Sequence, residues 1–145
     1  MERHLDQELD RARQMLLRMG GMVESMVARS TQALLERDSQ LSSAVIESDS
    51  DVDQLEMEID EVCHSILVRR QPTAVDLRFV VAVMKINSDL ERIGDSAVNI
   101  AQSVEQLNEQ PPLKPYIDLP HLSQLVQTRV RKSLAASGLA PRRRA

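Results

Sequence analysis

Three stretches of the chain, residues 5–33, 41–66 and 79–107, carry apolar residues at alternating steps of three and four. This spacing is typical of helices that pack along a seam, and each stretch keeps it for about four heptads. The seam of the third stretch comprises Phe79, Val83, Ile86, Leu90, Ile93, Ala97, Ile100, Val104 and Leu107. Extra apolar residues beside the seams widen each stripe to what a three-helix core needs.

Breaks between the seams agree with this periodicity. Asp38 and Ser39 suit a helix start, and Pro72 separates the second seam from the third. We therefore expect helices near residues 5–36, 39–70 and 74–108. The predicted fold class is all-α, an antiparallel three-helix bundle followed by a short fourth helix.

Composition supports packed helices. Aromatic residues make up only 1% of the chain, whereas sheets usually rely on aromatic and β-branched residues. The single cysteine excludes an intramolecular disulfide. No segment approaches the ~18 apolar residues of a membrane span, and the N-terminus lacks the apolar stretch of a signal peptide. We expect a soluble, cytoplasmic protein.

Charge and proline content divide the chain. Residues 1–118 hold all 22 acidic and 12 of the 18 basic residues, a net charge of −10, whereas residues 119–145 have six basic residues and no acid. An acidic body argues against nucleic-acid binding. The expected layout is a bundle over 1–110, a Pro-rich linker over 111–120, the start of a second, incomplete bundle over 121–136 and a disordered basic tail over 137–145.

Two acidic pairs fall on the predicted helices: Asp49 with Asp53, and Glu91 with Asp95. Residues four apart share a helix face. With a turn centred near Pro72, antiparallel neighbours have numbers that add up to about 144 or 145. Asp53 then falls opposite Glu91, and Asp49 opposite Asp95. The four carboxylates are expected to converge on one groove of the bundle surface.

Such a group of like charges repels itself, and a bound cation relieves the repulsion. Asn87 and Asn99, one turn away at either end of the pair on the third helix, are possible accessory oxygen ligands. Oxygen ligands suit hard cations such as Mg²⁺, Mn²⁺ or iron. The alternative interpretation is a solvated acidic face without metal.

Other reactive groups form weaker patterns. Cys63, beside the second seam, has the position of a small buried hydrophobe rather than a reactive thiol. The three histidines show no metal-ligand spacing, and the sequence lacks the two inward Glu-x-x-His motifs, one on each of two helices, that buried di-metal bundles use. The sequence also contains no Gly-rich phosphate loop, no Gly-x-Ser-x-Gly and no Cys-x-x-Cys motif. No catalytic residue is therefore predicted.

Several runs together resemble the PhoU family of phosphate-signalling regulators. They are Met19-Gly20-Gly21-Met22-Val23, Arg70-Gln71-Pro72, Asp76-Leu77-Arg78, Lys85-Ile86-Asn87 and Leu90-Glu91-Arg92-Ile93-Gly94-Asp95, with Ala97 and Asn99-Ile100-Ala101. The resemblance implies two three-helix bundles in tandem, each with two Asp/Glu-x-x-x-Asp motifs that bind surface metal clusters, iron or zinc in some members. Asp49, Asp53, Glu91 and Asp95 occupy the first bundle's motif positions.

The resemblance also implies a function. The protein would be a non-enzymatic, often dimeric regulator in the cytoplasm. It would negatively regulate phosphate uptake and the phosphate-starvation response by contacting the ATPase subunit of the phosphate ABC transporter and a membrane sensor histidine kinase. Two alternatives remain open, namely a metal-dependent phosphatase-type hydrolase and a metal-free helical interaction module.

The fourth helix departs from the family pattern, because the second bundle stops after about half a helix. Its apolar stripe would then lack a second core to cover it. The stripe comprises Leu122, Leu125, Val126, Val130 and Leu134. We expect self-association through residues 121–136, or disorder there.

Overall fold

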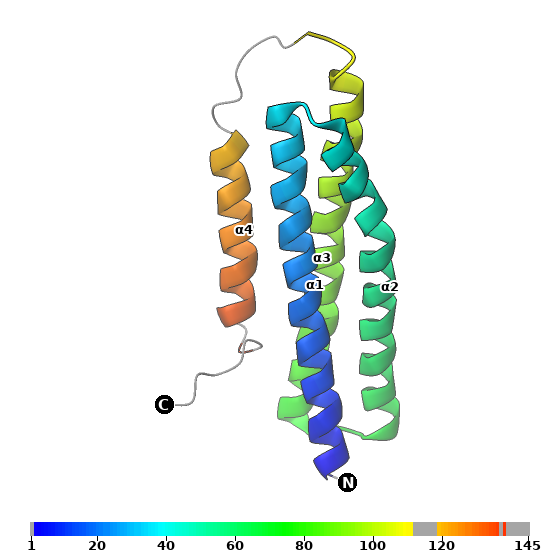
Figure 1. Ribbon diagram of the computed structural model, residues 1–145. Helices are drawn as coiled ribbons and strands as arrows, with labels where there is room; N and C mark the ends of the chain where they lie inside the picture. The colour runs from blue at the N-terminus through cyan, green and yellow to red at the C-terminus, as the bar shows by residue number, and fades with distance from the viewer. Residues whose placement is uncertain (1, 112–118, 137, 139–145) are drawn as a thin grey trace.

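The computed structural model describes residues 2–111, 119–136 and 138. These residues form four helices and no strand: α1 (Glu2–Glu36), α2 (Ser39–Arg69), α3 (Ala74–Leu107) and α4 (Leu119–Ala136). The first three form an antiparallel bundle, and α4 lies along α1 on the side away from α2 (Figure 1). The predicted all-α bundle is confirmed. The predicted mobility of the basic tail concerns residues that lie almost entirely outside the described ranges.

The turn between α1 and α2 is short and capped on both sides. Asp38 is the N-cap of α2, and its carboxylate accepts hydrogen bonds from the backbone N–H groups of Gln40 and Leu41, both at 3.1 Å. Arg37 has φ 55°, in the left-handed region, which lets the chain reverse within two residues. The Arg37 guanidinium donates to the carbonyl oxygen of Asn108 at 3.2 Å, so this turn also holds the end of α3.

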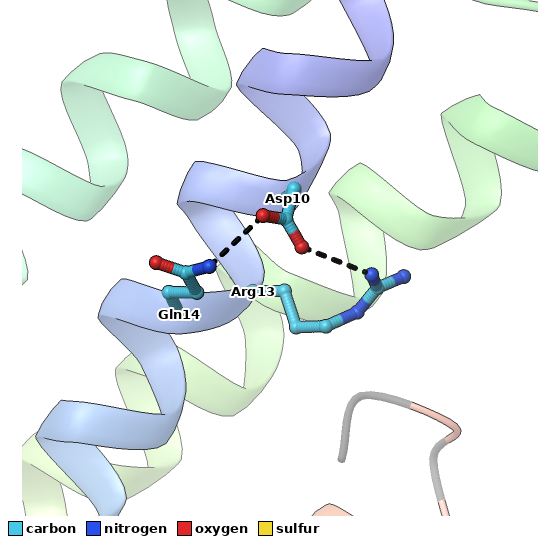
Figure 2. A network of polar contacts seen from close by, with 3 residues as sticks. All are labelled: Asp10, Arg13 and Gln14. Atoms are coloured by element: carbon cyan, nitrogen blue, oxygen red, sulfur yellow. Dashed lines mark hydrogen bonds and ion pairs between the residues drawn. The ribbon is translucent and has the colours of Figure 1, made fainter. Parts of the chain in front are cut away.

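The opposite end of the bundle is held by side chains of α1. Asp10 accepts hydrogen bonds from Gln14 at 2.9 Å and from Arg13 at 3.5 Å (Figure 2). The Arg13 guanidinium also lies 5.1 Å from the ring centroid of Phe79, a cation–π contact between α1 and α3. Arg70, after α2, donates to a Glu8 carboxylate oxygen at 3.1 Å.

The core face of α3 differs from the predicted seam. Val83, Leu90, Ala97 and Val104 are buried as expected. At the other seam positions before Leu107, the buried residue is the one that follows the predicted residue in the sequence. The buried positions are Val80, Asn87, Gly94 and Ala101, whereas the predicted Phe79, Ile86 and Ile93 are half-buried and Ile100 and Leu107 are exposed. The small side chains of the buried set let α3 approach α1 and α2 closely, and hydropathy alone does not mark them as core.

Helix α4 is ordered against α1, which corrects part of the prediction for its apolar stripe. Val130 and Leu134 are buried, whereas Leu122, Leu125 and Val126 remain exposed. Leu134 packs so close to Gly20 of α1 that a Cβ at this glycine would lie 2.5 Å from Leu134 Cδ1. The self-association through the exposed part of the stripe stays a prediction. Helix α4 also begins two residues before the expected His121, because a proline is tolerated in the first turn of a helix.

Candidate functional site

Carboxylates from α2 and α3 meet across the groove between these two helices. One oxygen from each of Asp49, Asp53 and Asp95 lies within 4.8 Å of the other two, and the same holds for Asp53, Glu56 and Glu91. Asp53 belongs to both groups. The structure therefore brings together all four acids that the sequence placed opposite one another, in a cluster that we call the α2–α3 carboxylate groove.

Glu56 is the member that sequence reasoning missed. It lies three residues after Asp53 on α2, so it shares the same helix face. Glu56 belongs to neither of the two predicted pairs of acids spaced four residues apart, Asp49 with Asp53 and Glu91 with Asp95. A search for acids three apart, combined with the antiparallel pairing of α2 and α3, would have placed Glu56 within one turn of Glu91.

The groove is short of positive charge and of hydrogen-bond donors. Among the described residues, no Lys, Arg or His nitrogen lies within 4.0 Å of any of its five carboxylates. Asp49 Oδ1 is buried and has no hydrogen-bond partner among them. A buried acceptor without a partner costs free energy, so this oxygen fits a site whose missing partner is a cation.

Burial and mutual repulsion perturb three of the five acids. Burial, followed by the charges of Asp53 and Asp95, raises the pKa of Asp49 above its ordinary value. Burial, followed by the neighbouring carboxylate of Asp95, also raises the pKa of Glu91. For Glu56 the first cause of the raised pKa is again burial, and the second is the charge of Glu91. Each shift shows that the bare groove disfavours its own negative charge.

The two predicted accessory ligands lie in different surroundings. Asn87 is 1% exposed and lies in the core, where its Nδ2 donates to the backbone oxygen of Glu56 at 3.1 Å. Its Oδ1 is buried without a hydrogen-bond partner among the described residues. Asn99 is exposed, and no hydrogen bond in the described part of the chain joins its side chain to the groove. Asn87 thus lies on the inner side of α3 and Asn99 on its surface, and a ligand role for either stays a prediction.

The raised pKa values predict an unusual pH dependence for the metal-free protein. A folded state with raised carboxyl pKa values binds more protons than the unfolded state, so these groups cost stability at neutral pH. The cost falls as the pH drops toward the ordinary carboxyl range near pH 4. We expect wild type to gain stability on acidification relative to a triple variant, Asp49→Asn with Glu56→Gln and Glu91→Gln, as measured by urea unfolding in chelator. A difference between the two proteins that stays constant with pH would contradict this.

The remaining reactive candidates are structural. Cys63 is fully buried, and burial, with a smaller contribution from Asp60, raises the pKa of its thiol to about 11. A thiol with this pKa is protonated at neutral pH and unreactive. His64 is exposed, and its Nδ1 lies 2.8 Å from the backbone oxygen of Asp60. None of the described helices contains a stretch long and apolar enough to cross a membrane.

Comparison with known proteins places this geometry in a family. The PhoU domain matches residues 16–104, which include all five acids of the groove. A phosphate-specific transport system accessory protein PhoU homolog from Pseudomonas putida is 44% identical over 130 residues, covering 89% of this chain and 51% of that protein. The chain spans about half to three fifths of the length of the curated relatives with which it aligns over 130 residues.

Solved structures agree with the fold. The crystal structure of PhoU from Pseudomonas aeruginosa superimposes with a TM-score of 0.86 at 42% identity, over 90% of this chain and 63% of that one. The phosphate transport system regulatory protein PhoU from Streptococcus pneumoniae gives a TM-score of 0.82 at 30% identity, over 91% and 62% of the two chains.

Proposed function

Because this chain belongs to the PhoU family, we propose that it is a regulatory accessory protein of phosphate transport that holds metal ions on the α2–α3 carboxylate groove. The observation that carries the metal part of this proposal is the convergence of five carboxylates, none of which has a Lys, Arg or His nitrogen within 4.0 Å among the described residues. Such an arrangement is costly unless a bound ion neutralises it.

Two ligand groups support two neighbouring ion positions. Asp49, Asp53 and Asp95 would hold one ion, and Asp53, Glu56 and Glu91 the other, with Asp53 shared. Carboxylate oxygens favour hard cations, so Mg²⁺, Mn²⁺ and iron suit the groove better than zinc, which more often takes nitrogen and sulfur ligands. The bound ions would stabilise the α2–α3 pair and present a fixed surface.

The groove fits a binding role better than hydrolysis. In many phosphoryl-transfer sites, cationic side chains assist the metal ions in stabilising charge on the transferred group. Within the described residues, the groove has no Lys or Arg within 4.0 Å of its carboxylates. We therefore propose a non-enzymatic regulator rather than a phosphatase-type hydrolase.

The names of the relatives support a transport system as a partner. They are called accessory proteins of the phosphate-specific transport system, and we propose that this chain likewise contacts the ATPase subunit of a phosphate ABC transporter. A membrane sensor histidine kinase is the second proposed partner, through which the protein would restrain the phosphate-starvation response. Both contacts would be made in the cytoplasm. Self-association through the exposed stripe of α4 is proposed as well.

A direct binding assay tests the transporter contact. We expect the purified chain to bind saturably to the immobilised ATPase subunit of a phosphate ABC transporter, and more weakly to the ATPase subunit of an ABC transporter for another solute. Binding to each of the two ATPase subunits is measured with chelator and with Mn²⁺. The comparison shows whether metal on the α2–α3 carboxylate groove contributes to the affinity. Equal binding to the two ATPase subunits, or none to either, would overturn the proposed partner.

A further inference from the structure

A second hollow lies on the other side of α2, between α2 and α1. Its volume is about 390 Å³, within the range of small-molecule sites. Its α1 wall carries Arg18, Gly21, Ser25 and Arg29, which recur every three or four residues along one helix face. None of these residues belongs to the carboxylate groove, which faces α3. We call this hollow the Arg18–Arg29 groove.

The Arg29 guanidinium is held in place without being neutralised. Its Nη2 donates to Ser48 Oγ at 3.1 Å, and Ser48 Oγ donates in turn to the backbone oxygen of Ala44 at 2.8 Å. Its Nε is buried and has no hydrogen-bond partner among the described residues. A guanidinium that is fixed at one nitrogen and has no carboxylate within 4.0 Å among the described residues keeps its charge for an oxyanion.

Arg18 provides a second unpaired cation at the other end. In the described part of the chain, no carboxylate lies within 4.0 Å of either arginine, although Asp51 lines the same hollow. The two arginines are eleven residues apart on one face of α1, which is about 16 Å along the helix axis. A single small anion cannot span this distance, but two anionic groups on one molecule match it.

Gly21 keeps the middle of the groove open. A Cβ at this position would meet nothing within 4 Å, so a side chain here would extend into the hollow and not into the core. The neighbouring Gly20 instead faces α4, where a Cβ would meet Leu134. The two consecutive glycines therefore serve two different surfaces, and only the first of them is explained by helix packing.

We propose that the Arg18–Arg29 groove binds an elongated small molecule with an anionic group at each end, of which a hexose bisphosphate is the chemical type. Arg18 and Arg29 each bind one phosphoryl group through forked hydrogen bonds. The Ser25 hydroxyl and the open surface at Gly21 accept the middle of the molecule.

Isothermal titration calorimetry in chelator tests this proposal with three probes: a hexose bisphosphate, the matching monophosphate and inorganic phosphate. Chelator empties the carboxylate groove, so the outcome is independent of the metal proposal. We expect the bisphosphate to bind at least about tenfold more tightly than the other two, because each hydrogen bond to a charged group contributes about that factor. Equal affinities, or no saturable binding of the bisphosphate up to about 10 mM, would overturn the proposal.

Variants locate the site. Arg18→Gln and Arg29→Gln should each lower the affinity for the bisphosphate about tenfold or more. Arg11→Gln is the control, because it also removes one positive charge from α1 but lies in a separate hollow. This variant should leave the affinity for the bisphosphate unchanged. Gly21→Leu should abolish binding while its melting temperature stays at or above that of wild type, since leucine favours helix more than glycine. Binding that survives Gly21→Leu, or that falls equally in Arg11→Gln, would contradict the assignment.

Discussion

Replacing Glu91 and Asp95 together, by Gln and Asn, is expected to stabilise the protein in chelator and to destabilise it relative to wild type in the presence of Mn²⁺ or Fe³⁺. Without metal, the change removes two charges from a groove whose carboxylates repel one another. With metal, wild type gains stability from an ion that binds only the folded state. The gain is about 2.7 kcal/mol when free metal exceeds the dissociation constant a hundredfold.

Melting curves with chelator and with metal measure this reversal. Asp49→Asn with Asp53→Asn should behave in the same way, because both pairs belong to one cluster. Glu58→Gln with Glu61→Gln is the matched control. It removes two exposed charges from α2 outside the groove and should show no reversal. An unchanged wild-type midpoint on adding metal would mean that the groove is only a solvated acidic face.

Asn87→Asp is expected to cost about 3–5 kcal/mol of unfolding free energy at neutral pH in chelator, the cost of a buried charge without a partner. Asn87 is 1% exposed, and its amide nitrogen donates to the backbone oxygen of Glu56. An aspartate loses this donor and adds a charge one turn from Glu91. Because burial raises the pKa of such a carboxyl, the folded state binds its proton more tightly, and the loss should shrink as the pH falls.

Asn87→Leu separates charge from shape at the same position. Leucine removes the unpartnered Oδ1 together with the donor, and we expect a change within about 1 kcal/mol of wild type. Urea unfolding of both variants at neutral and mildly acidic pH gives the comparison. If Asn87→Asp cost no more stability than Asn87→Leu at neutral pH, the expected cost of a buried charge at this position would be contradicted. The side chain at position 87 would then be hydrated.

The helices and most of the groove could be predicted from the sequence because both depend on local spacing. Apolar residues at steps of three and four define long helices, and Asp38 and Pro72 mark two of their boundaries. Two antiparallel helices joined by a short turn have a nearly fixed register. That register was sufficient to bring Asp49 and Asp53 of α2 opposite the acids of α3. Glu56 obeyed the same geometry and was missed only because acids three apart were not considered.

The surroundings of these residues were decided by the tertiary structure. The core face of α3 passes through Asn87 and Gly94 rather than Ile86 and Ile93, since α3 must fit against α1 and α2 at once. Hydropathy along one helix ranks isoleucine above glycine as a core residue, but close contact between three helices favours the smaller side chain. Likewise, α4 packs on α1 because Gly20 has no side chain and leaves room for Leu134. This space forms only when the two helices pack together, so the sequence of either helix alone does not reveal it.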